Sequence, residues 1–167
     1  HAGCEAANSA ANLGSRVLLI TMNLQTIGEM RCNPAMGGIA KGQIIREIDA
    51  IGGCSGVVTD ETMIQFRMLN MSKGPAMWSP RAQSDRILFS LKWRQILESN
   101  DNIDFYQDMV IGLIKRGDKI SGVRTRLGHE IQSKSVILTN GTFLNGIIHI
   151  GEKQVAGGRI SEKNSIG

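Results

Sequence analysis

An alanine-rich segment, a glycine and a continuous apolar run open this chain, and their order constrains the fold more than any other feature. Alanines recur through residues 3–13, Gly14 follows as a helix stop signal, and residues 17–20 read Val-Leu-Leu-Ile. A short run of this kind is typical of a strand buried on both faces of a sheet. Helix, glycine and buried strand form the second half of a βαβ unit, which predicts an α/β fold.

Gly3 lies at the start of this predicted helix. In dinucleotide-binding folds a G-x-G-x-x-G segment precedes the helix, and its third glycine lies three residues after the second. Gly3 fits that third position if the first two glycines lie just upstream of His1. A single glycine is no fingerprint, because a small residue that packs an ordinary helix on a sheet explains Gly3 equally well. The chain also starts without Met, on a helix already in progress, so we expect it to be a piece of a longer protein.

The rest of the chain alternates between predicted helices and strands. Residues 59–70 fit either a strand or a short helix. Ser79 followed by Pro80 is a favoured helix start, and this helix is expected to run to about Glu98. A strand over 103–108, turns at 116–119 and 127–129, and alternating residues between them predict an antiparallel meander within about 103–134.

A last buried strand is expected over residues 135–139, ending in a turn that contains Gly141. A parallel sheet with an antiparallel meander inserted before its final strand is the layout of flavin-binding domains of the glutathione-reductase type. The fold is therefore predicted as α/β, a Rossmann-like FAD-binding domain with an inserted antiparallel β-meander. Gly141 would then lie at the carboxyl edge of the sheet, where ligands bind in such folds.

Cys32 lies in a loop broken by Pro34, and two adjacent glycines follow it. Isoleucines at 44, 45, 48 and 51 then recur at helical spacing, which predicts a helix. A thiol just before a helix is near the positive end of the helix dipole, and this favours the nucleophilic thiolate over a thiol of pKa roughly 8.5. Arg31 and Lys41 act in the same direction. The alternative is a small buried residue in a tight glycine turn, since free cysteine is among the most buried residue types.

Composition narrows the class of protein. The 167 residues are enough for one domain with a real core, and the net charge of +4 permits an anionic partner. Aromatic residues are only 4%, which argues against an autonomous binder of single-stranded nucleic acid, because such a binder needs stacking platforms. Three cysteines at unrelated spacings form neither a disulfide framework nor a zinc pattern, which indicates a reducing cytoplasm and no metal site. No signal peptide or membrane span is visible in the sequence.

Seven segments together resemble one known family, the glucose-inhibited division protein A family of tRNA uridine 5-carboxymethylaminomethyl modification enzymes. They are GEMRCNPAMGGIAKG (28–42), EIDAIGG (47–53), SKGPA (72–76), RAQSDR (81–86), LTNGTFL (138–144), IHIG (148–151) and GGR (157–159). The resemblance runs the whole length of this chain and covers only the amino-terminal part of the family's protein. It implies an FAD-binding domain fragment over residues 1–167 that lacks the first strand and the leading glycines. On its own such a fragment is expected to be inactive.

The resemblance implies an FAD enzyme of the cytoplasm that modifies the wobble uridine of certain tRNAs together with a GTPase partner. Methylenetetrahydrofolate would supply a one-carbon unit and NADH the reducing equivalents, with NADH bound outside this stretch. The intact protein would be a homodimer. Two alternatives stay open: the folate-dependent tRNA uracil-5 methyltransferase, and a non-catalytic nucleotide-binding or interaction module.

The resemblance also implies roles for particular residues. Cys32 matches a family cysteine that takes part in the chemistry, either by adding to uracil C6, which makes C5 nucleophilic, or by acting at the flavin. The positions that match FAD contacts are His1, Ala2, Gly3, Val110 and Ser165, and Gly141 lies at the expected ligand edge. Lys73 and Arg81 would contact a phosphate or a substrate carboxylate, with a solvated surface role as the alternative. Cys4 and Cys54 are expected to be structural.

Overall fold

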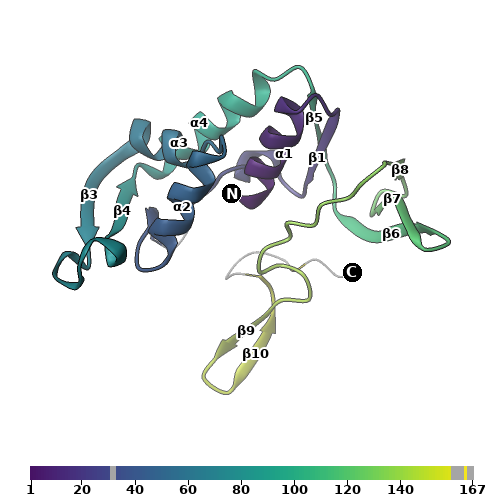
Figure 1. Cartoon of the computed structure of the whole chain (residues 1–167). Coiled ribbons are helices and arrows are strands. Elements are labelled where there is room, and N and C mark those ends of the chain that lie inside the picture. Colours follow the sequence, from purple (N-terminus) through teal and green to yellow (C-terminus); the bar gives the residue numbers. More distant parts are fainter. Residues whose placement is uncertain (31–32, 159–163, 165–167) are drawn as a thin grey trace. The chain divides into compact units, whose positions relative to one another are not determined.

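The computed structural model describes residues 1–30, 33–158 and 164 (Figure 1). Its contacts divide the chain into two compact units. The first comprises His1–Leu19 and Gln25–Asp104, and the second comprises Ile20–Leu24 and Phe105–Gly167. None of the helices in the described ranges is long and apolar enough to cross a membrane.

The core of the first unit lies between two helices, α1 (Ala2–Asn12) and α4 (Arg86–Glu98). The predicted helix near the start of the chain is thus confirmed. The buried apolar residues of these two helices are Cys4, Ala7 and Ala11 of α1 and Phe89, Trp93 and Leu97 of α4. The small residues of α1 allow a close approach to the large side chains of α4, which are completely buried.

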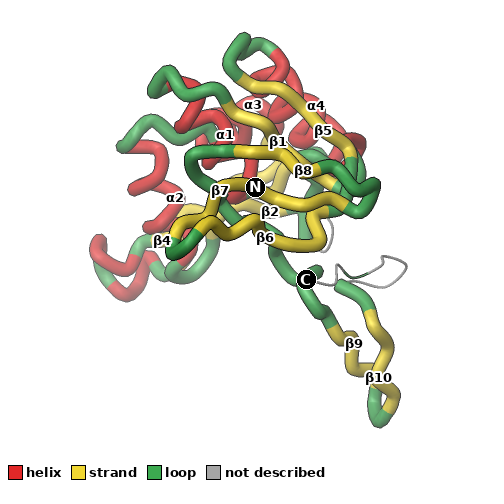
Figure 2. Tube along the Cα trace, turned by 90° about the vertical axis from the view of Figure 1, so that its right-hand side faces the viewer, coloured by secondary structure: helices red, strands yellow, loops and turns green. Residues whose placement is uncertain are grey.

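Strand β1 (Val17–Thr21) pairs with β5 (Ile103–Gln107), and the two strands run side by side in Figure 2. The Val17 N–H donates to the Asn102 carbonyl at 2.8 Å, and the Asp108 N–H donates to the Thr21 carbonyl at 3.0 Å. The residue numbers rise together in the two strands, so the pair is parallel. The prediction that β1 is buried on both faces is wrong, since Leu18 is 38% exposed. The physical reason is that β5 is its one neighbouring strand among the described residues.

A three-stranded antiparallel sheet forms the other part of the first unit, in the order β2-β4-β3. Its strands are β2 (Ala35–Gly37), β3 (Met63–Leu69) and β4 (Ser79–Ser84), and it is accompanied by α2 (Lys41–Ala50) and α3 (Ser55–Thr62). The isoleucine spacing correctly predicted α2. Residues 59–70, which fitted either a helix or a strand, contain both: α3 ends at Thr62 and β3 begins at Met63. The chain also contains short 3-10 turns, η1 (Leu24–Thr26), η2 (Met71–Lys73) and η3 (Pro75–Met77), of which the last two lie within the first unit.

The predicted helix start at Ser79 and Pro80 is wrong, because both residues belong to the central strand β4. The Ser79 hydroxyl donates to the Gly38 carbonyl, and the Gly38 N–H donates to the Pro80 carbonyl at 2.9 Å. These bonds to the β2 segment outweigh the local helix signal. Helix α4 instead begins after Asp85, whose Oδ1 accepts the N–H groups of Ile87 and Leu88, each at 2.9 Å. The Asp85 N–H also donates to the Thr62 carbonyl at 2.8 Å, and the predicted helix end at Glu98 is confirmed.

The second unit contains an antiparallel meander, formed by β6 (Val110–Arg116), β7 (Lys119–Thr125) and β8 (Glu130–Gln132). It begins later than the predicted 103–134, because the strand expected at its start, β5, pairs with β1 instead. A hairpin of β9 (Ile147–Ile150) and β10 (Lys153–Ala156) follows. The predicted strand over 135–139 is wrong. No strand in the described part of the chain pairs with this apolar run, and Ile137 and Leu138 are 64% and 58% exposed. An apolar composition does not make a strand without a hydrogen-bonded neighbour.

Candidate functional site

The first turn of α1 holds three of the predicted cofactor residues, His1, Ala2 and Gly3. His1 occupies the N-cap position without a side-chain cap, and its ring packs edge-on against Phe89 with ring centroids 5.4 Å apart. The first backbone N–H groups of a helix have no partner within the helix, so they are available to a ligand. The helix dipole favours an anion at the same place, which fits the pyrophosphate of a dinucleotide.

Glu5 also lies in the first turn of α1, where its negative charge would oppose an anionic ligand. Its carboxylate, however, is held by the start of α3. Oε1 accepts the Ser55 N–H at 2.6 Å, and both oxygens lie 3.1 Å from the Cys54 N–H. Glu5 therefore caps a different helix, and the positive end of α3 offsets its charge. This contact could not be predicted from the sequence, because nothing local relates residues 49 and 50 positions apart.

The two described cysteines are unsuited to nucleophilic chemistry. Cys4 is 5% exposed, and burial raises the pKa of its thiol. Burial, together with the negative charge of Glu5, also raises the pKa of the Cys54 thiol. The Asn8 side-chain amide donates to the Cys54 sulfur at 3.2 Å. Both thiols are kept protonated, as expected of structural cysteines.

Cys32, the predicted nucleophile, and Ser165 lie outside the described residues. The nearest described residues around Cys32 are well anchored. Met30 is 3% exposed, and the Pro34 carbonyl accepts the N–H of Ser84 at 2.7 Å.

Arg81 lies in β4, directly across from Gly37 of β2. Gly37 has φ +84°, and a β-carbon there would lie 2.2 Å from the Pro80 carbonyl oxygen, so only glycine fits. The Cδ of Arg81 lies 4.0 Å from the position that a β-carbon on Gly38 would take, next to the uncapped N-terminus of α2. Lys73 lies elsewhere, exposed in the η2 turn. Neither cation makes an ion pair with a described residue.

The remaining predicted residues belong to the second unit. Val110 begins β6, half-buried and paired with Thr125, and Gly141 has φ +60° in an exposed turn. The structure thus groups His1, Ala2 and Gly3 at one helix start and places Arg81 beside the glycine turn at another.

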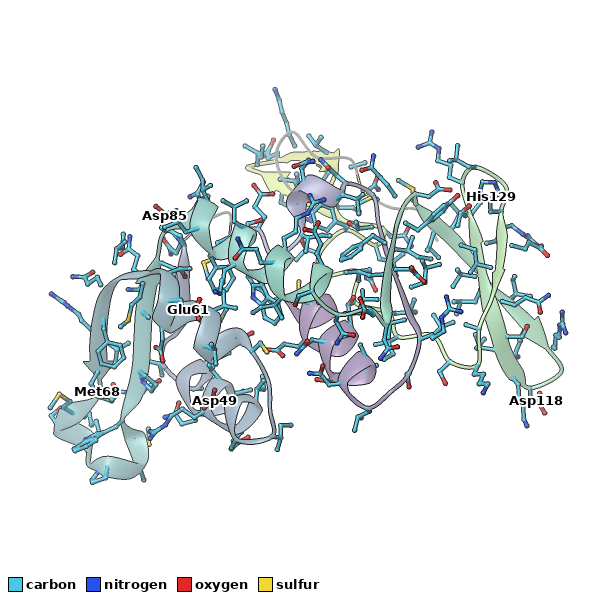
Figure 3. All side chains as sticks on the ribbon, turned by 90° about the horizontal axis from the view of Figure 1, so that it is seen from above. Asp49, Glu61, Met68, Asp85, Asp118 and His129 are labelled. Carbon is cyan, nitrogen blue, oxygen red and sulfur yellow. The ribbon has the colours of Figure 1, made fainter. Side chains whose placement is uncertain are left out.

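A polar cluster next to Val110 was not found from the sequence. The Tyr106 hydroxyl and the His129 Nδ1 lie 2.5 Å apart. Burial acts to raise the pKa of Asp108, but hydrogen bonds from the Thr125 side chain and from the Met109 and Leu127 N–H groups outweigh it and hold that pKa below its ordinary value. The cluster closes the meander around its β7–β8 turn, where Figure 3 labels His129. Its members come from separate segments of the chain, so no local motif reveals it.

A second missed feature is an open cavity of about 510 Å³ in the first unit. None of the predicted site residues reaches this cavity. Its lining includes four asparagines and one cysteine: Asn8, Asn12, Asn100, Asn102 and Cys54. Within the described ranges, no three His, Cys, Asp or Glu side chains are grouped so that they could hold a metal ion.

Comparison with known proteins decides the family. The family model described as "Glucose inhibited division protein A" matches residues 1–167. The chain belongs to this family. A relative from Cytophaga hutchinsonii, named tRNA uridine 5-carboxymethylaminomethyl modification enzyme, is 68% identical over 167 residues, which are all of this chain and 27% of that protein. A relative of the same name from Flavobacterium johnsoniae is also 68% identical, with the same coverage. The chain therefore spans about a quarter of the length of these relatives.

Solved structures agree with the assignment to the glucose-inhibited division protein A family. The structure of Aquifex aeolicus GidA matches with a TM-score of 0.93 and 48% identity, covering 100% of this chain and 28% of that chain. The GidA-related protein from Thermus thermophilus shares the fold alone, with a TM-score of 0.61 and 20% identity over 97% of this chain and 58% of that one. The predicted fold class and the family resemblance are both confirmed.

Proposed function

We propose that residues 1–167 form the FAD-binding domain of an enzyme that takes part in 5-carboxymethylaminomethyl modification of the wobble uridine of tRNA. The observation that carries this proposal is the 68% identity, over the whole chain, to relatives named for that modification. The proposal includes tRNA as substrate, methylenetetrahydrofolate as one-carbon donor and NADH bound outside this stretch. It also includes a GTPase partner, a homodimer for the intact protein, and a cytoplasmic location.

The start of α1 supports the proposed place for FAD. His1, Ala2 and Gly3 would hold the pyrophosphate through backbone N–H groups, since the one acidic side chain of that turn is bound to α3. Val110, Gly141 and Ser165 would contribute further contacts to the cofactor. Bound FAD would supply the redox chemistry, while the protein supplies position and electrostatics.

Cys32 is the proposed catalytic residue. The other two cysteines are less suited to nucleophilic chemistry, because burial raises the pKa of both the Cys4 and the Cys54 thiol. Lys73 and Arg81 are proposed to contact substrate, as a point charge and a planar fork for phosphate or carboxylate groups. Neither has an ion pair with a described residue to give up.

The proposal is tested by mass analysis of tRNA nucleosides from a strain that lacks the gene. Loss of 5-carboxymethylaminomethyluridine is the expected result. Loss of ribothymidine instead would favour the folate-dependent methyltransferase. Unchanged nucleosides, together with purified protein that shows no flavin absorbance, would favour the third alternative, a non-catalytic nucleotide-binding or interaction module.

A further inference from the structure

One face of the β2-β4-β3 sheet carries two polar cross-strand pairs, here called the Arg/Gln face: Arg67 with Arg81, and Gln65 with Gln83. Residues directly opposite each other in an antiparallel ladder point to the same side, with Cβ atoms about 4.5–5.5 Å apart. The intervening residues Phe66, Met68 and Ala82 belong to the other face. Figure 3 labels Met68 and so locates this sheet.

All four side chains of the Arg/Gln face lack internal partners. No hydrogen bond or ion pair joins any of them to a described residue. Two acids near these strands in the sequence are already engaged: Glu61 pairs with Lys92 at 2.5 Å, and Asp85 caps α4. Two like charges directly opposite each other destabilise a sheet unless an anion lies against both. The Arg67–Arg81 pair therefore points to an external anionic ligand.

The surroundings of the pair leave room for such a ligand. Arg67 and Gln65 are exposed, and Arg81 and Gln83 are half-buried. On the β2 side Arg81 faces Gly37, so no side chain covers that flank of the strand. The first turn of α2 packs against the Ser79 and Pro80 end of β4, where a β-carbon on Gly42 would lie 2.6 Å from the Pro80 carbonyl oxygen and 2.7 Å from the Ser79 hydroxyl. The N-terminus of α2 adds a positive field of its own.

The chemistry of the four side chains selects the class of ligand. Planar guanidinium groups bind phosphate oxygens through two parallel hydrogen bonds. Glutamine amides both donate and accept, as ribose hydroxyls and base edges require. We propose that the Arg/Gln face binds the phosphodiester backbone of the substrate tRNA, with Arg67 and Arg81 on phosphates and Gln65 and Gln83 on neighbouring hydroxyls or base edges. This inference rests on the proposed function and adds Gln65, Arg67 and Gln83 to the substrate site.

The test measures tRNA affinity of the intact protein against salt concentration for the wild type and the double variant Arg67→Gln/Arg81→Gln. We expect a loss of affinity of about tenfold or more at low salt, and a salt slope lower by about 0.7 per lost phosphate contact to a single strand. The matched control is Arg116→Gln/Arg126→Gln, which removes two exposed arginines of the meander that have no ion pair. This control should keep both the affinity and the slope close to wild type.

A second double variant distinguishes the loss of specific contacts from misfolding. Arg67→Lys/Arg81→Lys keeps the charges and loses the planar forks, so its affinity should fall while its salt slope stays at the wild-type value. Wild-type affinity and slope in both Arg67/Arg81 variants would overturn the inference while leaving the proposed function intact. Loss of flavin absorbance with unchanged tRNA affinity would also overturn it, in favour of a small anionic ligand. If the wild type binds no tRNA at all, the proposed function itself fails.

Discussion

The Glu5 carboxylate of α1 lies 2.6 Å from the backbone N–H of Ser55, the first residue of α3. An acidic side chain in the first turn of one helix thus caps another helix 50 residues away. The contact fixes α1 against α3, and it removes a negative charge from the helix start at which a cofactor phosphate is proposed to bind.

Replacing Glu5 by Gln keeps the size of the side chain and removes its charge. We expect the free energy of unfolding to fall by about 1 kcal/mol, as for loss of a helix cap. Urea titration followed by circular dichroism measures the change. The control is Glu47→Gln, because Glu47 is exposed on α2 and its change should stay within about 0.5 kcal/mol. Equal effects of the two substitutions would argue against the cap.

The same substitution should change the reactivity of Cys54. Burial and the Glu5 charge raise the pKa of this thiol above its ordinary value of 9.0, so alkylation should become fast only as the pH rises beyond that value. Glu5→Gln removes one of the causes, leaving burial and the weaker effect of the Asp49 charge, and should shift the alkylation profile of Cys54 to lower pH. Mass mapping of the peptide that contains Cys54 follows the reaction. An unshifted profile would mean that Glu5 does not act on this thiol.

Asp108 should make the free energy of unfolding depend on pH in the acidic range. Its pKa is lowered in the folded protein, so its contribution to stability is present above the ordinary pKa of 3.8 and is lost as the pH falls through the folded value. Asp108→Asn should therefore unfold more easily than wild type at neutral pH, and the gap should narrow in acid. Thermal unfolding at a series of pH values measures it. Asp118→Asn, in an exposed turn, should show no such gap, and a gap of constant size in the Asp108 variant would contradict the prediction.

Gly37 and Gly52 form a matched pair of glycines with positive φ. A β-carbon at Gly52 meets nothing within 4 Å, so Gly52→Ala should cost only the left-handed strain of about 1–2 kcal/mol. At Gly37 the β-carbon would also collide with the Pro80 carbonyl oxygen, and Gly37→Ala should cost about 1–3 kcal/mol more than Gly52→Ala. Denaturant unfolding compares the two variants. Similar losses would show that β2 moves away from β4 without penalty.

Cys32→Ser in the intact protein should abolish wobble-uridine modification and leave FAD bound, because serine lacks the nucleophilic thiolate. Cys54→Ser is the control and should retain activity. Nucleoside mass analysis and flavin absorbance report the two properties separately. Full modification by the Cys32 variant would remove this residue from the mechanism.

Local patterns predicted the elements whose signals are local. The alanines of α1 and the isoleucine spacing of α2 correctly predicted these two helices. The Ser79-Pro80 signal failed because it competes with hydrogen bonds to Gly38, 41 residues earlier in the chain. Asp85, the true cap, carries an equally good local signal, and only the strand pairing decides between the two positions.

The same distinction between local signals and contacts of distant segments applies to the candidate site. Gly3 and the Gly37–Gly38 turn could be located from the sequence, since Gly3 lies in the first turn of a helix and Gly37–Gly38 precedes one. The Arg67–Arg81 pair could not, because the register between β3 and β4 brings the two together. The Glu5 cap and the Asp108 cluster likewise depend on contacts between distant segments. Residues 135–139 show the opposite failure, in which strand-like composition has no strand partner.

Asp85 connects the β3–β4 sheet to helix α4, and the spacing of the two elements along the chain must agree. Its N–H belongs to the end of the β3–β4 ladder through Thr62, while its carboxylate starts α4. Adding or deleting a single residue between Ser79 and Arg86 would break either the hydrogen bond to Thr62 or the cap of α4. Natural relatives should therefore vary in length at the Gly117 turn of the meander and keep the length of this stretch constant.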